Sequence, residues 1–294
     1  MRPSEGLRHR AEQLAAVLPP LLVAAERVAQ TVSQGVHGRR RVGQGEAFWQ
    51  FRRYEPGDPA QAIDWRQSAK RERVFVRQNE WEAAQSVWLW RDGTASMRYR
   101  SALSPVEKGE RATVLLLALA VLLVRAGEHV ALHGEGFAPS AGRGTIERLA
   151  LALSRGDSPG DRLSLPGRDP LPRHARLVLI GDFLVPIESV AALAASLAAR
   201  GVRGHVLQVL DPAEETLPFV GRNRFEGLEG DGEVLVRRTE RLREAYGARM
   251  GAHQAALREI ARTHGWTFAV HRTDRPPQAA LLALYTALAE APGM

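Results

Sequence analysis

Hydrophobic residues gather along the chain in two kinds of segment, and their alternation predicts an α/β fold. Short apolar runs are typical of buried strands at residues 86–90, 129–133, 176–180, 205–210 and 266–271. Longer segments between and after them have helical periodicity, at residues 104–124, 144–154, 186–200, 242–264 and 276–291. This order favours a three-layer arrangement, in which a mostly parallel sheet carries helices on both faces.

The segment 104–124 is the most apolar of the predicted helices. From Ala112 to Val124 it is apolar on nearly all sides, which is typical of a helix buried between other layers. Ser104-Pro105-Val106-Glu107 has the pattern of a capping box with proline at the first helical position. The longest apolar run, Val114–Val124, is shorter than the roughly 20 residues that cross a bilayer. With no secretory signal visible, we expect a cytoplasmic protein without a membrane span.

Two regions depart from the strand and helix alternation. Residues 4–34 have helical periodicity interrupted by Pro19-Pro20, which predicts a helix packed on the rest of the protein or, as an alternative, one that docks a partner. Residues 35–84 are glycine-rich and polar, with a strand-like run at 74–77, and residues 213–239 suggest a hairpin with a strand at 234–236. We therefore divide the chain into an N-terminal segment, residues 1–84, with a helix and a small β-rich part, and an α/β domain, residues 85–294.

Charge and composition limit the kinds of ligand and metal site that the chain can have. The net charge is +7 and the basic residues are nearly all arginine, which resembles a compositional bias as much as a nucleic-acid-binding face. The absence of cysteine excludes disulfides, thiolate metal sites and thiol nucleophiles, so oxygen or histidine ligands remain. The histidines lack the spacing of a zinc hydrolase, and no phosphate-binding P-loop motif occurs.

One stretch concentrates basic and aromatic residues. Aromatic residues, among them Phe48, Trp49, Phe51, Tyr54 and Trp65, lie among its cations. This favours either a nucleic-acid interface or, as the better interpretation, a small sheet with paired arginines. The basic residues are Arg39, Arg40, Arg41, Arg52, Arg53, Arg66, Lys70, Arg71, Arg73 and Arg77.

Three oxygen-bearing side chains follow the strand at 86–90. Asp92, Thr94 and Ser96 are hard donors of the kind that Mg²⁺ or Mn²⁺ accepts. The alternative is that Asp92 and Gly93 form a turn that closes the strand, and that the hydroxyl of Thr94 or Ser96 caps the next helix. The loop also resembles that of haloacid-dehalogenase-type phosphatases, but their nucleophilic aspartate would fall at Trp90, so we exclude that chemistry.

Two more aspartates end predicted strands, Asp182 after 176–180 and Asp211 after 205–210. Because the carboxyl ends of parallel strands share one edge of the sheet, Asp182 is a candidate to complete a metal site begun by Asp92. Thr145, at the start of the helix at 144–154, is a further candidate. Asp211 precedes a proline, and we interpret it as a cap of the following turn.

The chain resembles the bacterial family called domain of unknown function 58 (DUF58). The resemblance rests on Arg53-Tyr54-Glu55-Pro56-Gly57-Asp58, on Ile63-Asp64-Trp65, and on the strand that ends in Asp92-x-Thr94-x-Ser96. It implies a von Willebrand factor A-like domain with a metal-ion-dependent adhesion site (MIDAS), in which Thr94 replaces a serine, keeping the hydroxyl. Thr145 and Asp182 match the positions of its remaining ligands. The family-signature residues are Arg53, Tyr54, Pro56, Gly57, Asp58, Ile63, Asp64 and Trp65.

The same resemblance implies a function. We expect a non-enzymatic protein-interaction or adaptor protein, in which bound Mg²⁺ or Mn²⁺ keeps one coordination position open for a carboxylate of a partner. The family also implies a MoxR-type AAA+ ATPase as the partner, in chaperone-like or complex-maturation activity. The alternative is a nucleic-acid-binding module that uses the Arg39–Arg77 segment. A metal-dependent hydrolase is a third possibility, but the motif lacks an evident general base.

Overall fold

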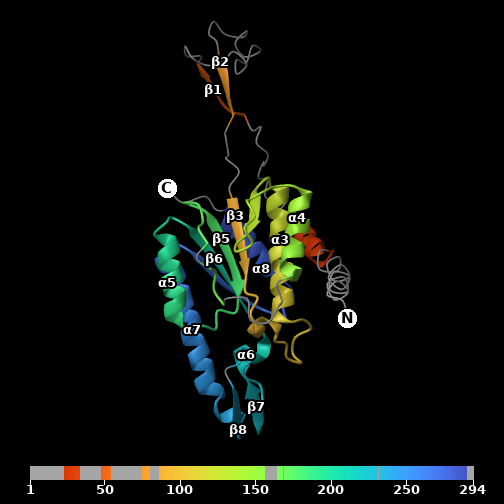
Figure 1. The fold of residues 1–294 in the computed structure, drawn as a ribbon, viewed down its shortest axis with the longest axis vertical. Helices are drawn as coiled ribbons and strands as arrows, with labels where there is room; N and C mark the ends of the chain where they lie inside the picture. Colours follow the sequence, from red (N-terminus) through yellow and green to blue (C-terminus); the bar gives the residue numbers. More distant parts are fainter. Residues whose placement is uncertain are drawn as a thin grey trace, which may run out of the picture.

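The centre of the molecule is a parallel sheet of five strands in the order β4-β3-β5-β6-β9 (Figure 1). The computed structural model describes residues 23–33, 48–53, 75–79, 86–155, 164–167, 169–230 and 232–289. The strands are β3 (Ser86–Arg91), β4 (His129–Leu132), β5 (Arg176–Gly181), β6 (Arg203–Leu210) and β9 (Thr267–Arg272). The predicted α/β class and the parallel sheet are thereby confirmed, and the five predicted strands agree with the observed ones within two residues at each end.

Successive residues of the central strands enter opposite apolar layers, which explains why these strands are continuous hydrophobic runs. In β5, Val178 and Ile180 belong to one buried cluster, whereas Leu177 and Leu179 belong to the other. The sheet is therefore covered on both faces, as expected for a parallel sheet.

Helices form the two outer layers (Figure 1). On one face lie α3 (Lys108–Arg125), α4 (Arg143–Arg155), α8 (Gln278–Ala289) and the helix at residues 23–33, whose Ala25, Val28, Ala29 and Val32 share the cluster of α3. The other face is covered by α5 (Ile187–Ala198) and α7 (Arg243–Thr263). The three-layer prediction is confirmed, and α3 is buried along nearly its whole length, as its apolar sequence predicts.

The prediction for the start of α3 was wrong. The helix begins at Lys108, and the Ser104 side chain does not cap it. Instead, the Ser104 hydroxyl donates to the Val106 carbonyl at 2.7 Å, and it also accepts from the Val106 N–H at 3.3 Å. The local turn takes the hydrogen bonds that a capping box would have used, and the Lys108 N–H reaches the Tyr99 carbonyl at 3.2 Å.

The remaining elements are short. The predicted hairpin is present as β7 (Asn223–Glu226) and β8 (Glu233–Val236), which pair antiparallel. In the N-terminal segment, β1 (Phe48–Arg53) pairs antiparallel with β2 (Phe75–Asn79), consistent with the predicted small β-rich part. Three short helical turns, η2 (Ala95–Arg98), α6 (Pro212–Thr216) and η3 (Thr239–Arg241), had not been predicted.

Several predictions fall outside the described residues. Among the family-signature residues, the structure describes only Arg53, at the end of β1. Most of the basic Arg39–Arg77 segment and the first part of the N-terminal helix are also outside the described ranges. Among the described helices, none has both the length and the apolar character needed to cross a membrane.

Candidate metal centre

The candidate site lies where three neighbouring strands end. Asp92 follows β3, Asp182 follows β5 and Asp211 follows β6, and these strands are adjacent in the sheet. The Asp92 N–H donates to the Ile180 carbonyl at 2.9 Å, which holds the β3 end beside β5. Gly181 makes the close approach possible, because a Cβ atom at this position would lie 2.8 Å from the Cβ of Asp92. The predicted convergence of Asp92 and Asp182 is therefore present.

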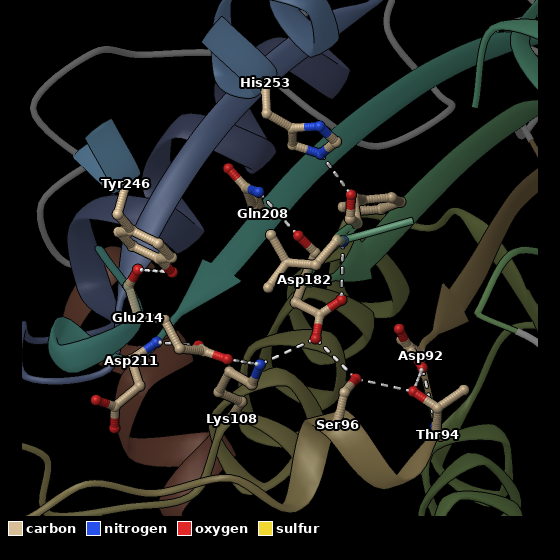
Figure 2. A network of polar contacts seen from close by, with 12 residues as sticks. Asp92, Thr94, Ser96, Lys108, Asp182, Gln208, Asp211, Glu214, Tyr246 and His253 are labelled. Atoms are coloured by element: carbon tan, nitrogen blue, oxygen red, sulfur yellow. Dashed lines mark hydrogen bonds and ion pairs between the residues drawn. The ribbon is translucent and has the colours of Figure 1, made fainter. Parts of the chain in front are cut away.

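The loop after β3 is organised by the carboxylate of Asp92 (Figure 2). Its Oδ1 accepts hydrogen bonds from the Thr94 N–H at 2.8 Å and from the Thr94 hydroxyl at 2.7 Å. Thr94 Oγ1 also lies 3.0 Å from Ser96 Oγ. The Thr94 side chain makes no cap hydrogen bond to η2. Its hydroxyl is part of a polar network, so the alternative interpretation of Thr94 as a helix cap is not supported.

The network continues from Ser96 to the neighbouring strand. Ser96 Oγ donates to Asp182 Oδ2 at 2.7 Å, so the motif after β3 and the aspartate after β5 are directly joined. The other carboxylate oxygen of Asp182 accepts from the Leu184 N–H at 3.1 Å. Four of the five predicted site residues, Asp92, Thr94, Ser96 and Asp182, thus form one continuous network (Figure 2).

The second carboxylate oxygen of Asp92 differs from the first. Asp92 is fully buried, and its Oδ2 has no hydrogen-bond partner among the described residues. Burial, together with the negative charge of Asp182, raises the pKa of Asp92 to about 6. An ionised carboxylate with one unsatisfied oxygen is costly in such surroundings, and a cation beside Oδ2 would remove that cost.

Lys108 supplies a cation to the other half of the network (Figure 2). Its Nζ donates to Asp182 Oδ2 at 2.9 Å and to Glu214 Oε1 at 2.6 Å, and the lysine is fully buried. Burial alone would lower the pKa of Lys108, but the two carboxylates outweigh it and raise that pKa. Burial would likewise raise the pKa of Asp182, whereas the ammonium group and the Ser96 hydroxyl lower it overall.

Glu214 connects Lys108 to α6 and α7. Its Oε2 accepts from the Asp211 N–H at 2.9 Å, and its backbone carbonyl accepts from the Tyr246 hydroxyl of α7. Burial raises the pKa of Glu214 despite the nearby ammonium group. Asp211 itself caps α6, accepting from the Ala213 N–H at 2.8 Å in a capping box with Glu214. The interpretation of Asp211 as a cap is confirmed.

Thr145 lies in the first turn of α4, and its described hydrogen bonds go elsewhere. Its Oγ1 is 3.0 Å from Ser140 Oγ, and its N–H donates to the Gly142 carbonyl at 3.1 Å. Neither contact joins it to the network of Asp92 and Asp182. Its role as a metal ligand stays a prediction.

The donor set fits a small divalent cation. One buried carboxylate with an unpaired oxygen and two hydroxyls, Asp92, Thr94 and Ser96, are ligand types that Mg²⁺ and Mn²⁺ accept. Nowhere in the described ranges, this site included, do three or more histidine, aspartate or glutamate residues gather as metal ligands, so the candidate centre depends on one carboxylate and the two hydroxyls.

Sequence reasoning missed Lys108 and Glu214. One signal was available, because Lys70 and Lys108 are the only lysines among 40 basic residues. A compact ammonium group suits a buried position between two carboxylates better than the larger guanidinium, which has five N–H donors to satisfy. The position of Lys108 depends on the first turn of α3, whose start was predicted wrongly. The position of Glu214 depends on α6, which was not predicted.

Two mycobacterial proteins match most of the chain. The chain is 27% identical over 287 residues to the uncharacterized protein Rv1480 of Mycobacterium tuberculosis, covering 90% of this chain and 86% of that protein. The uncharacterized protein Mb1516 of Mycobacterium bovis matches over the same length at the same identity and coverage.

Two solved structures are more distant. An aerotolerance-related membrane protein from Bacteroides fragilis is 18% identical, with a TM-score of 0.41 over 70% of this chain and 99% of that one. The conserved hypothetical protein BatB from Bacteroides thetaiotaomicron is 16% identical, with a TM-score of 0.42 over 71% of this chain and 100% of that one. These TM-scores are too low for either structure to bear on the fold or the function.

The family model described as "Protein of unknown function DUF58" matches residues 50–256, more than half of the chain. This match covers the strand ends that carry Asp92 and Asp182 and includes the family-signature residues. The chain belongs to the DUF58 family.

Proposed function

We propose that this protein is a non-enzymatic adaptor that recognises a protein partner through a divalent cation, Mg²⁺ or Mn²⁺, held at the carboxyl edge of its sheet. The observation that carries the proposal is the fully buried Asp92, whose Oδ2 has no hydrogen-bond partner among the described residues. A carboxylate in this state needs either a proton or a cation, and a cation-binding site uses that need.

The residues have separate roles in the proposal. Asp92 supplies the charged ligand, and the hydroxyls of Thr94 and Ser96 supply neutral ones. Asp182 acts through Ser96, whose hydroxyl proton it accepts, so that the lone pairs of Ser96 Oγ are directed away from Asp182. When bound, the ion supplies Lewis acidity, and a ligand set with few carboxylates leaves it able to accept a carboxylate from a partner.

Exposed apolar side chains favour a protein as the partner. Five of the exposed large hydrophobic residues gather in the 23 residues that include the β7–β8 hairpin: Val220, Leu228, Val234, Leu235 and Leu242. The chain reaches this hairpin from β6 through α6, which contacts the site through Glu214. Exposed large apolar side chains gathered in one part of a molecule are typical of protein interaction sites.

We further propose a MoxR-type AAA+ ATPase as this partner, with chaperone-like or complex-maturation activity as the outcome. This part of the proposal rests on the DUF58 family membership and the family resemblance described above. It predicts that a carboxylate of the ATPase completes the coordination of the ion.

Calorimetric titration of Mg²⁺ and Mn²⁺ into metal-stripped protein tests the site. The wild-type protein should bind one equivalent, and Asp92→Asn should bind none. Asp169→Asn removes the same charge from an exposed aspartate and should bind like the wild type. Thr145→Val decides whether the threonine of α4 is a ligand. Equal binding by the wild type and Asp92→Asn would refute the proposed site.

Affinity capture with a purified MoxR-type ATPase tests the partner. Capture should require Mg²⁺ or Mn²⁺, and it should be lost with EDTA and with Asp92→Asn. Capture that survives both changes would show that the ATPase does not use the metal site. Metal binding without capture would leave the site in place and refute this partner.

A further inference from the structure

The candidate site already contains a cation that belongs to the chain. The Nζ of Lys108 lies between Asp182 Oδ2 and Glu214 Oε1, at 2.9 Å and 2.6 Å (Figure 2). The Lys108 side chain is 0% exposed, so water does not screen these contacts. Lysine is almost never fully buried unless it is paired, and here two carboxylates on two different elements pair with it.

Asp182 has no carboxylate oxygen left without a donor. Its Oδ2 accepts from both Lys108 and Ser96, and its Oδ1 accepts from the Leu184 N–H. Asp92 differs, because its Oδ2 has no hydrogen-bond partner among the described residues. The two aspartates that end adjacent strands are therefore in different states: Asp182 is paired with a cation, and Asp92 has an oxygen without a hydrogen-bond partner in the described part of the chain.

We infer that Lys108 is the resident counter-cation of Asp182, and that it restricts a divalent ion to Asp92 by keeping Asp182 from coordinating the metal. This inference deepens the proposed function and rests on it for the wild-type protein. Lys108 is a positioning residue in this scheme, because it acts on the ion only through Asp182 and through its own charge. Its positive charge near the ion also weakens metal binding.

The inference predicts an unusual effect of removing Lys108. In Lys108→Met, Asp182 loses its counter-cation and becomes available as a second charged ligand. The affinity for Mg²⁺ and Mn²⁺ should increase by about tenfold or more, because an opposing charge is removed and an attracting one is exposed. The shift in melting temperature on adding Mg²⁺ should grow correspondingly.

Two further variants separate charge from coordination. Lys108→Met combined with Glu214→Gln has the same net charge as the wild type. It leaves one carboxylate without a cation, whereas Lys108→Met alone leaves two, so the double variant should fold more easily. It should still bind the ion more tightly, because Asp182 remains free. Arg224→Met removes one positive charge from the exposed β7–β8 hairpin, and it should bind the ion like the wild type.

Calorimetry and thermal melts with Mg²⁺ on the full chain test the inference. Tighter binding and larger melting shifts in both Lys108→Met proteins support it, and equal or weaker binding overturns it while the proposed function stands. If only these variants bind the ion, the inference holds and the proposed function fails. If no protein binds, both fail. Lys108→Met proteins that stay unfolded at saturating Mg²⁺ also overturn it, since the ion should replace the ammonium group.

Discussion

The ammonium group of Lys108 lies 2.9 Å from Oδ2 of Asp182, and both side chains are buried. The contact joins the first residue of α3 to the residue that follows β5. Glu214 of α6 pairs with the same ammonium group at 2.6 Å. Three elements that are distant in the sequence thus meet at one buried charge.

Removing this charge should destabilise the metal-free protein. Lys108→Met leaves Asp182 and Glu214 without their cation, and breaking a buried pair from one side costs about 3–5 kcal/mol. Urea unfolding in EDTA measures the loss. Arg224→Met breaks an exposed pair with Glu233, 3.7 Å apart, and should cost about 0–1 kcal/mol. A similar small cost for both variants would show that the buried pair contributes little.

Asp92→Asn should stabilise the metal-free protein at pH 8. Burial raises the pKa of Asp92 to about 6 from its usual value of 3.8, so between these two pH values the folded protein holds a proton there that the unfolded chain releases. Native stability therefore falls as the pH rises from about 4 to 6, and the loss persists above that range. Each pKa unit corresponds to about 1.4 kcal/mol, so the variant should gain about 2–3 kcal/mol at pH 8.

Most of this gain should disappear at pH 4, where the wild-type carboxyl group is protonated. Urea unfolding of both proteins at pH 4 and pH 8 in EDTA makes the comparison. A variant that is less stable than the wild type at pH 8 would contradict the prediction.

Metal affinity should depend on pH through the same carboxyl group. Because the ion needs the ionised form of Asp92, affinity should fall about tenfold for each unit below pH 6. Calorimetry at pH 7.5, 6 and 5, in two buffers with different heats of ionisation, also counts the protons released. That number should approach one at pH 5 and zero at pH 7.5. An affinity that is unchanged between pH 7.5 and 5 would exclude Asp92 as the charged ligand.

The β7–β8 hairpin offers a test of partner binding that leaves the site intact. Replacing Val234 and Leu235 with serine removes two exposed apolar side chains, which should change the free energy of unfolding by no more than about 0.5 kcal/mol. Capture of the protein partner should weaken at least tenfold, while Mg²⁺ binding stays at the wild-type level. Leu282→Ser, on the exposed side of α8, is the matched control and should capture normally. Equal capture by both variants would place the partner elsewhere.

The sequence predicted the fold well because its strands are short, apolar and separated by helical segments. The same regularity located Asp92 and Asp182, since the carboxyl ends of adjacent parallel strands must lie at one edge. The Asp-x-Thr-x-Ser spacing then identified Thr94 and Ser96, which the structure joins to both aspartates.

The site residues that the sequence did not predict are those whose position depends on tertiary contacts. Ser104 had the spacing of a helix cap, but its hydroxyl closes a local turn, and α3 begins at Lys108 beside Asp182. Glu214 sits on a helix of five residues, too short for hydrophobic periodicity to reveal. Their pairing with Lys108 follows from how α3 and α6 meet the sheet edge, which no local pattern encodes.

Gly181 limits which residues the protein can accept at the end of β5. A side chain at the end of β5 would collide with Asp92, since even a Cβ atom would come within 2.8 Å of the Asp92 Cβ. In a library randomised at position 181, chains with any other residue must move the end of β3 away from β5 and separate the two carboxylates. Selection for partner binding should therefore return glycine alone, although this residue offers the ion no ligand.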